Sequence, residues 1–273
     1  MQIKLNGKIT KIQCNTLAEL KGQYGKEEDI VILNGFSVPI EEFISGTRTL
    51  KEMDEVFFIH RGVLPGQEEL EAMMASRHTP GVWEKVNNAS VAVAGLGGLG
   101  SHIAVMLART GVGKLLLVDF DVVEPSNLNR QNYLVSHLGK KKTEALKEQI
   151  AQINPFIQVE TIDRRVTSQN AAGIFEEYPI ICEAFDRPEA KAALVNAVLM
   201  ELPESTIVSA SGMAGYDSAN EIKTVRKMSR LYVCGDMENE AKEGRGLMAP
   251  RVQVCAGHQA NMVLRLILGI TDV

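Results

Sequence analysis

Four glycines, Gly95, Gly97, Gly98 and Gly100, form a loop of a kind that binds phosphate groups. Three of them have the spacing G-x-G-x-x-G, which lets a backbone turn tightly and approach phosphate oxygens, while the next helix offers free N–H groups and the positive end of its dipole. Asp119 ends the following apolar run, where a carboxylate can bind ribose hydroxyls. These residues predict a nucleotide site, and the spacing alone fits either NAD or ATP.

The polar segment that follows favours a triphosphate. It contains Asp121, Asn127 and Arg130, and Lys142 ends a run of three lysines. NAD carries a diphosphate that backbone N–H groups can hold, whereas a triphosphate attacked at its α-phosphorus develops charge that arginine and lysine stabilise. A lysine at a helix N-terminus also opposes the helix dipole, which favours a compensating anion near Lys142.

Asp186 follows another apolar run and is expected at the same edge of the sheet as the glycine loop. A carboxylate there could hold Mg²⁺, which usually takes one or two carboxylates together with phosphate oxygens. The alternative is that Asp186 caps the helix predicted to start at Pro188. The spacing leaves both interpretations open.

The elements that would position these residues alternate between strand and helix from residue 90 onward. Apolar runs without polar alternation are typical of strands buried on both faces. This order predicts an α/β fold with a doubly wound, mostly parallel, Rossmann-like sheet whose ligands bind at the carboxyl edge. The expected strands are 90–94, 114–118, 157–161, 179–182 and 207–210, with possible antiparallel additions at 221–225 and 231–233. One expected helix follows the glycine loop and ends at 108. The other expected helices span 142–153, 168–177, 188–201 and 251–268.

The first sixty residues predict a small α+β unit of the β-grasp kind. Asn6-Gly7 is a hairpin turn between two predicted strands, Asn34-Gly35 is a second Asn-Gly turn after another predicted strand, and Thr16 is a good N-cap for a helix between the two turns. Leu64-Pro65-Gly66 then breaks the pattern. We expect three parts: a β-grasp domain at 1–63, a helical linker with Arg77 at 64–89, and a nucleotide-binding domain at 90–273.

Composition excludes several classes of protein. The chain has 273 residues, 45% hydrophobic and 23% charged, with a net charge of −5, so it neither predicts disorder nor gives an overall electrostatic case for nucleic acid. It has no apolar run of membrane length and no signal-peptide pattern at its start, so we expect a cytoplasmic protein. The four cysteines form no CxxC pair, which predicts neither zinc nor a disulfide scaffold.

These motifs together resemble the ubiquitin-activating-enzyme superfamily, and within it the ThiF-like adenylyltransferases. The resemblance rests on G-x-G-G-x-G at the loop, D-F-D at Asp119, N-L-x-R-Q ending at Gln131, G-x-x-K ending at Lys142, and the strand-end Asp186. It covers about residues 76–270, and residues 1–62 resemble the small ThiS-like sulfur carriers. The chain therefore looks like a carrier-like domain fused to an activating enzyme.

The resemblance implies adenylation of a ThiS-like carrier in thiamine thiazole synthesis. The carrier's C-terminal glycine carboxylate would attack the α-phosphate of ATP and release pyrophosphate. Arg77 matches an arginine that in relatives reaches from the partner subunit to the terminal phosphates, which implies a homodimer. The other implied roles are the nucleotide loop (Gly95, Gly97, Gly98), ribose binding (Asp119), phosphate contacts (Asn127, Arg130), stabilisation of the transferring phosphoryl group (Lys142) and Mg²⁺ binding (Asp186).

Three features depart from the family pattern. The paired cysteines that bind structural zinc in many relatives are absent, and no cysteine occurs in 240–245, where some relatives form a covalent link. The segment His60-Arg61-Gly62-Val63 continues into the chain rather than ending in Gly-Gly, so the N-terminal domain is expected to have a non-catalytic role. The segment 235–246 predicts a mobile crossover loop, because its stretch 238–246 is charged and lacks large apolar anchors.

Three alternatives to adenylation of a carrier stay open at this point. An NAD-dependent oxidoreductase would use the glycine loop and Asp119 but would leave Arg130 and Lys142 without a role. A non-catalytic scaffold would keep nucleotide binding alone. A relative acting on tRNA is disfavoured by the acidic balance of the chain.

Overall fold

The computed structural model describes residues 1–63, 65–79 and 81–273. The chain forms two compact units, Met1–Trp83 and Glu84–Val273, and the boundary falls inside helix α4 (Val82–Asn87). The helical segment expected as a linker is therefore divided between the two units. Among the described residues, no helix is long and apolar enough to cross a membrane.

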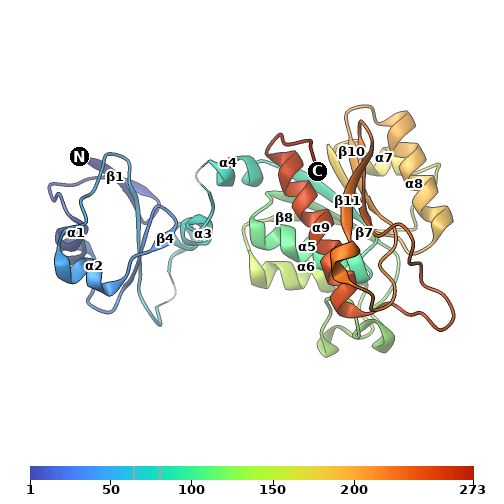
Figure 1. The fold of residues 1–273 in the computed structure, drawn as a ribbon, viewed down its shortest axis with the longest axis horizontal. Coiled ribbons are helices and arrows are strands. Elements are labelled where there is room, and N and C mark those ends of the chain that lie inside the picture. The colour runs from blue at the N-terminus through green and yellow to red at the C-terminus, as the bar shows by residue number, and fades with distance from the viewer. Residues whose placement is uncertain (64, 80) are drawn as a thin grey trace. The chain divides into compact units, whose positions relative to one another are not determined.

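The N-terminal unit is built on a five-stranded sheet of order β2-β1-β5-β3-β4 (Figure 1). Strands β1 and β5 pair in parallel and the other neighbours are antiparallel, which is the predicted β-grasp arrangement. Apolar residues of β1, β3 and β5 pack with α1 in one core. The elements are β1 (Gln2–Leu5), β2 (Lys8–Lys11), α1 (Leu17–Tyr24), β3 (Ile30–Leu33), β4 (Phe36–Ser37), α2 (Ile40–Ser45), β5 (Glu55–Ile59) and α3 (Gln67–Ala75).

Local sequence signals explain the turns of this unit. Asn6 and Gly7 have φ values of 47° and 82°, and Asn34 and Gly35 have 49° and 86°, as a type I′ hairpin turn requires. Thr16 caps α1, as predicted, and it forms a capping box with Glu19. The short β4 and α2 were not predicted, because neither has enough residues to show a period.

Helix α3 contacts the Asn6-Gly7 hairpin turn of its own unit rather than standing apart from it. Asn6 Nδ2 donates to Glu69 Oε1 at 2.8 Å, and a Cβ built on Gly7 would lie 2.6 Å from the Cβ of Ala72. A Cβ built on the second glycine, Gly35, would lie 3.2 Å from the carbonyl oxygen of Ser76. The two hairpin turns thus leave room for α3 and for the turn after it.

The C-terminal unit contains a seven-stranded sheet of order β11-β12-β10-β9-β6-β7-β8. All neighbours from β12 to β8 pair in parallel, which confirms the doubly wound prediction. Helices α7 and α8 cover one face of this sheet, and α5, α6 and α9 lie on the other (Figure 1). The strands are β6 (Ser90–Ala94), β7 (Lys114–Asp119), β8 (Gln158–Asp163), β9 (Ile180–Glu183), β10 (Thr206–Ala210), β11 (Lys223–Met228) and β12 (Leu231–Gly235). The helices are α5 (Gly98–Thr110), α6 (Lys142–Ile153), α7 (Ala171–Phe175), α8 (Pro188–Glu201) and α9 (Ala249–Ile267).

Two predictions about these elements were wrong in part. Only β11 is antiparallel, because β12 returns beside β10 and pairs with it in parallel. Helix α7 is shorter than expected, since the side chain of Asn170 accepts the N–H of Thr167 at 2.8 Å and forms a turn where the helix was predicted.

Candidate active site

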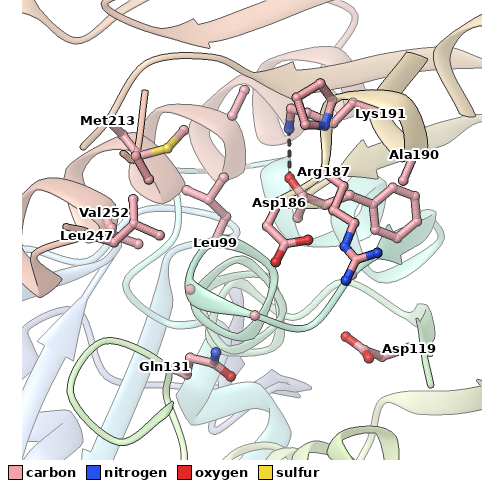
Figure 2. Close-up of a pocket in the computed structure, with 18 of the residues that line it drawn as sticks. Leu99, Asp119, Gln131, Asp186, Arg187, Ala190, Lys191, Met213, Leu247 and Val252 are labelled. Atoms are coloured by element: carbon pink, nitrogen blue, oxygen red, sulfur yellow. Dashed lines mark hydrogen bonds between the residues drawn. The ribbon is translucent and has the colours of Figure 1, made fainter. Parts of the chain in front are cut away.

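A cavity of about 610 Å³ opens at the carboxyl ends of the central strands, where ligands bind in sheets of this kind. Five loops contribute to it, after β6, β7, β8, β9 and β10, together with the segment that precedes α9. Figure 2 shows Asp186 and Arg187 reaching into it, with Asp119 beyond them and an apolar group on the other side. That apolar group consists of Leu99, Met213, Leu247 and Val252.

The glycines of the loop differ in their surroundings: three line the cavity, and the fourth allows close packing of the backbone. Gly95, Gly97 and Gly98 line the cavity. Gly95 has φ +91°, and a Cβ there would lie 2.8 Å from the carbonyl oxygen of Ala184. Gly100 is absent from the lining, and a Cβ on it would lie 1.7 Å from the Gly95 oxygen. The fourth glycine therefore allows α5 to approach the end of β6, and it does not line the cavity.

Asp119 is buried at the end of β7 and supports the glycine loop directly. Its Oδ2 accepts the N–H of Leu96 at 2.6 Å, and its Oδ1 accepts the N–H of Asp121 at 2.9 Å. Burial raises the pKa of the Asp119 carboxyl, and the positive charge of Lys142 acts in the opposite direction. The carboxylate lines the cavity and keeps lone pairs available for hydroxyl groups.

Lys142 is the first residue of α6, and only 7% of its side chain is exposed. Its Nζ donates to Asp121 Oδ2 at 3.0 Å. The carboxylate of Asp121 is thus the anion that compensates for the unfavourable position of a lysine at the positive end of the helix dipole. Lys140 and Lys141 are instead paired at the surface with Glu148 and Asp163. Of the three lysines, only Lys142 lines the cavity.

The segment before Lys142 brings Arg130 to the cavity but not Asn127. Arg130 lines the wall, and its Nη1 donates to the side-chain oxygen of Asn129 at 2.9 Å. Asn127 is buried, and its Oδ1 accepts the N–H of Glu124 at 3.0 Å. The backbone carbonyl of Asn127 accepts the N–H of Gln131, which does line the cavity. Asn127 thus shapes the turn that presents Arg130 and Gln131.

Asp186 is an exposed carboxylate in the cavity wall. The N-cap of α8 is Arg187, whose side chain makes no capping bond, so Asp186 does not have the capping role left open above. Within the described ranges, Asp186 has no hydrogen-bond or ion-pair partner. Its carboxylate points into the cavity between Leu99 and Arg187 (Figure 2).

A buried polar cluster fixes the loop that carries Asp186. Glu183 is fully buried at the end of β9, and its Oε1 accepts the N–H of Phe185 at 2.7 Å and Nζ of Lys191 at 2.9 Å. Its Oε2 accepts the hydroxyl of Ser209 at 2.5 Å. Lys191 also donates to the carbonyl of Phe185. The two bonds to Phe185 hold the backbone just before Asp186.

A sequence model of the ThiF family matches residues 71–273, and one of ThiS-like ubiquitin matches residues 1–62. The chain belongs to the ThiF family. Its curated relatives include the Saccharomyces cerevisiae "Adenylyltransferase and sulfurtransferase UBA4", 36% identical over 194 residues, which are 68% of this chain and 43% of that protein. The Dictyostelium discoideum "Ubiquitin-like modifier-activating enzyme 5" is 30% identical over 201 residues, 67% of this chain and 52% of that protein. The chain thus spans about half the length of these relatives.

Solved structures share the fold of this ThiF-family chain. Escherichia coli TcdA, a tRNA N6-threonylcarbamoyladenosine dehydratase solved with ATP, has a TM-score of 0.67 at 23% identity, covering 76% of this chain and 98% of that one. Escherichia coli MccB, solved with AMPCPP and MccA, has a TM-score of 0.55 at 24% identity, covering 75% and 63%. At this identity the two structures establish a common fold.

Sequence reasoning missed several cationic residues of this ThiF-family site. Arg164 and Arg165 follow β8 and Arg187 follows Asp186, and all three line the cavity. The guanidinium of Arg165 lies 4.5 Å from the ring centre of Phe120. Two adjacent arginines shortly after the predicted strand 157–161, at the ligand edge, were the signal that could have located this wall.

Arg77 and the cysteines lie outside the cavity lining. Arg77 belongs to the N-terminal unit, is exposed, and donates from Nη1 to the carbonyl of Gly35 at 3.4 Å. All four cysteines are buried, and burial raises the pKa of the Cys234 thiol to about 11. The described part of the chain contains no group of three or more His, Cys, Asp or Glu residues arranged to hold a metal ion.

Proposed function

We propose that this chain is an adenylyltransferase that activates the C-terminal carboxylate of a ubiquitin-like carrier protein with ATP. The observation that carries the proposal is the cavity itself. Three loop glycines, the buried carboxylate of Asp119, which is placed to bind ribose hydroxyls, and the cations Arg130 and Lys142 all line it. An NAD-dependent oxidoreductase needs the first two features, whereas a phosphoryl-transfer site also gives both cations a role.

The reaction balances without any further reactant. A carboxylate oxygen of the carrier forms a bond to the α-phosphorus, and the bond from that phosphorus to the bridging oxygen breaks. The products are an acyl-adenylate and pyrophosphate. Lys142 and Arg130 would stabilise the negative charge that develops on the phosphoryl oxygens, while the loop N–H groups and Asp119 hold the nucleotide in place.

Asp186 has the chemistry expected of a Mg²⁺ ligand beside a triphosphate. It is a single carboxylate, accessible from the cavity, and Mg²⁺ bound with phosphates commonly uses one or two carboxylates and several waters. Bound there, the ion would neutralise charge on the phosphate oxygens. The bonds from Glu183 and Lys191 to Phe185 would keep Asp186 oriented toward the phosphates.

A ubiquitin-like carrier is proposed as the substrate because of the names of the relatives and because of the residues that follow β10 at the cavity. The names of the yeast and Dictyostelium relatives describe an adenylyltransferase and an activator of a ubiquitin-like modifier. The segment 211–215 after β10 is composed of small residues apart from Met213, and it would leave room for an extended tail that ends in glycine. A ThiS-like carrier of thiamine synthesis remains the finer prediction. The name of the Dictyostelium relative points instead to a ubiquitin-like modifier.

Mass spectrometry of purified ubiquitin-like carriers incubated with the protein, ATP and Mg²⁺ tests the proposal. We expect one carrier to gain the mass of one AMP, with release of pyrophosphate. Nucleotide binding without transfer to any carrier would instead indicate the non-catalytic scaffold. Tight NAD binding without ATP binding would end the adenylation hypothesis.

A further inference from the structure

Arg251 is a buried charge that the proposed chemistry does not use. It lies in the first turn of α9, and only 3% of its side chain is exposed. Its Nη1 donates to the carbonyl of Ala214 at 2.8 Å, and its Nη2 donates to Asp236 Oδ2 at 2.6 Å. Burying an arginine costs folding free energy unless its charge is well paired, so the contacts of Arg251 with two separate loops call for a structural explanation.

Asp236, the partner of Arg251, organises the start of the crossover segment 236–247. Its side chain is 4% exposed, and its Oδ1 accepts the N–H groups of Glu238 and Asn239 at 2.9 and 2.8 Å. Burial alone would raise the pKa of this carboxyl, but the hydrogen bonds from Asn239, Glu238 and Arg251 outweigh it and lower the pKa. The segment expected to lack anchors is therefore held by a buried ion pair instead of by apolar side chains.

The two loops that Arg251 joins are in contact along their backbones. Gly212, at φ +77°, has no room for a Cβ, which would lie 2.0 Å from Asp236 Oδ1. The N–H of Asp236 donates to the carbonyl of Gly212 at 2.9 Å, and the N–H of Ala214 donates to the carbonyl of Asn239 at 3.0 Å. The loops after β10 and β12 thus form one continuous wall, fixed at its base by Arg251.

This wall lies on the side of the cavity away from the predicted ribose and phosphate residues. Asn239, Glu240 and Ala241 line the cavity together with Gly212 and Met213. The sheet order β12-β10-β9-β6-β7 places the loops after β10 and β12 on one side of Asp186, and the glycine loop and Asp119 on the other. A nucleophile approaching an α-phosphate held near Asp186 would come from the side of this wall.

We propose that Arg251 is a positioning residue for the incoming peptide tail, acting through Asp236 on the cavity-lining residues Asn239–Ala241. The proposal rests on the adenylation function proposed above. The tail is an extended peptide with a free terminal carboxylate, and the wall contacts its last residues. Loss of the ion pair should therefore weaken tail binding while leaving the nucleotide side unchanged.

The first test measures hydrogen–deuterium exchange in the unliganded full chain. We compare the wild type with Arg251→Gln, Asp236→Asn and the double variant, which leaves no uncompensated buried charge. Exchange in peptides from 236–247 should rise about tenfold in the variants, with β6 and α5 unchanged. Arg265→Gln is the matched control, because Arg265 lies on the same helix in an exposed pair with Asp272. Unchanged exchange in the double variant would overturn the proposed anchor, whether or not the chain proves to be an adenylyltransferase.

The second test uses the carrier that accepts AMP from the wild type. In pyrophosphate exchange, the double variant should raise the KM for the carrier about tenfold and leave the KM for ATP within about twofold. Arg251→Lys should recover part of the loss, since one ammonium can pair with Asp236 but cannot reproduce the guanidinium's two-sided contact. Equal changes in both KM values, or none, would contradict the positioning role. Failure of the wild type to modify any carrier would instead refute the proposed function.

Discussion

At the scale of single residues, Lys142 differs from the lysines beside it in burial and partner. Its side chain is 7% exposed, compared with 41% for Lys140. If it stabilises charge on the transferring phosphoryl group, Lys142→Ala should lower the rate of pyrophosphate exchange about 10²- to 10³-fold. Lys140→Ala, which removes a surface pair with Glu148, should leave the rate within about twofold. Similar rates in the two variants would remove Lys142 from the mechanism.

Substitution of Asp186 should have a different effect, because losing a metal ligand changes the Mg²⁺ concentration that the enzyme requires more than it changes the maximal rate. Asp186→Asn keeps the shape of the side chain but removes its charge, so the Mg²⁺ concentration that gives half-maximal activity should rise about tenfold or more. Glu189→Gln removes a nearby exposed charge from the first turn of α8 and serves as the control. A metal titration that is identical in Asp186→Asn and wild type would exclude the ligand role.

At the scale of elements, two helical glycines should respond to alanine in opposite directions. A Cβ on Gly100 would overlap the Gly95 carbonyl at 1.7 Å, so Gly100→Ala must push α5 off the end of β6. We expect a loss of about 3 kcal/mol in the free energy of unfolding. Gly257 in α9 has nothing within 4 Å of the same position, and Gly257→Ala should gain about 0.5–1 kcal/mol. Urea unfolding of both variants measures the difference, and equal effects would show that α5 can shift freely.

The elements that the sequence predicted well are those whose signals are local. The bounds of β6, α6 and α8 agree with the residues expected, because each begins or ends at a glycine, a proline or a change of hydrophobic period. The parallel pairing of β12 was missed because it depends on where the chain returns in the sheet. The Arg251–Asp236 pair was missed for a similar reason, since 15 positions separate residues whose partnership exists only once α9 has packed.

The candidate site shows the same division between local and long-range information. The glycine loop, Asp119 and Lys142 carry recognisable spacing, and the structure brings all of them to one cavity. Asn127 has the right neighbours in sequence but points into its own turn, since Oδ1 is satisfied by the Glu124 N–H. Whether a side chain faces the ligand or its own backbone depends on turn geometry, which a residue pattern does not specify.

At the scale of the whole molecule, two buried aspartates should affect acid stability with opposite signs. The pKa of Asp236 is lowered in the folded chain, so its stabilising contribution is present above the unfolded pKa and is lost as the pH falls below about 4. Burial raises the pKa of Asp119, so protonation of that residue offsets part of the loss. Between pH 6 and about pH 3.5, the free energy of unfolding measured in urea should depend less on pH in Asp236→Asn/Arg251→Gln than in the wild type. In Asp119→Asn it should depend more on pH than in the wild type. Parallel pH curves for the three proteins would contradict both assignments.

The last prediction concerns Arg77 and the proposed homodimer. If Arg77 acts on the nucleotide of a partner subunit, Arg77→Ala and Lys142→Ala should each be inactive alone. Each mixed dimer of the two would contain one intact site, so an equilibrated equal mixture should recover about one quarter of wild-type activity.

A mixture of Arg130→Ala and Lys142→Ala is the control, because both side chains line the cavity of one chain and no mixed dimer restores a complete site. Recovery in the first mixture alone would establish that Arg77 acts between subunits. Activity that stays absent in both mixtures would place Arg77 in the site of its own chain, whereas an Arg77→Ala variant that is active alone would place it outside the reaction. Sedimentation of the wild type as a monomer would exclude the shared site altogether.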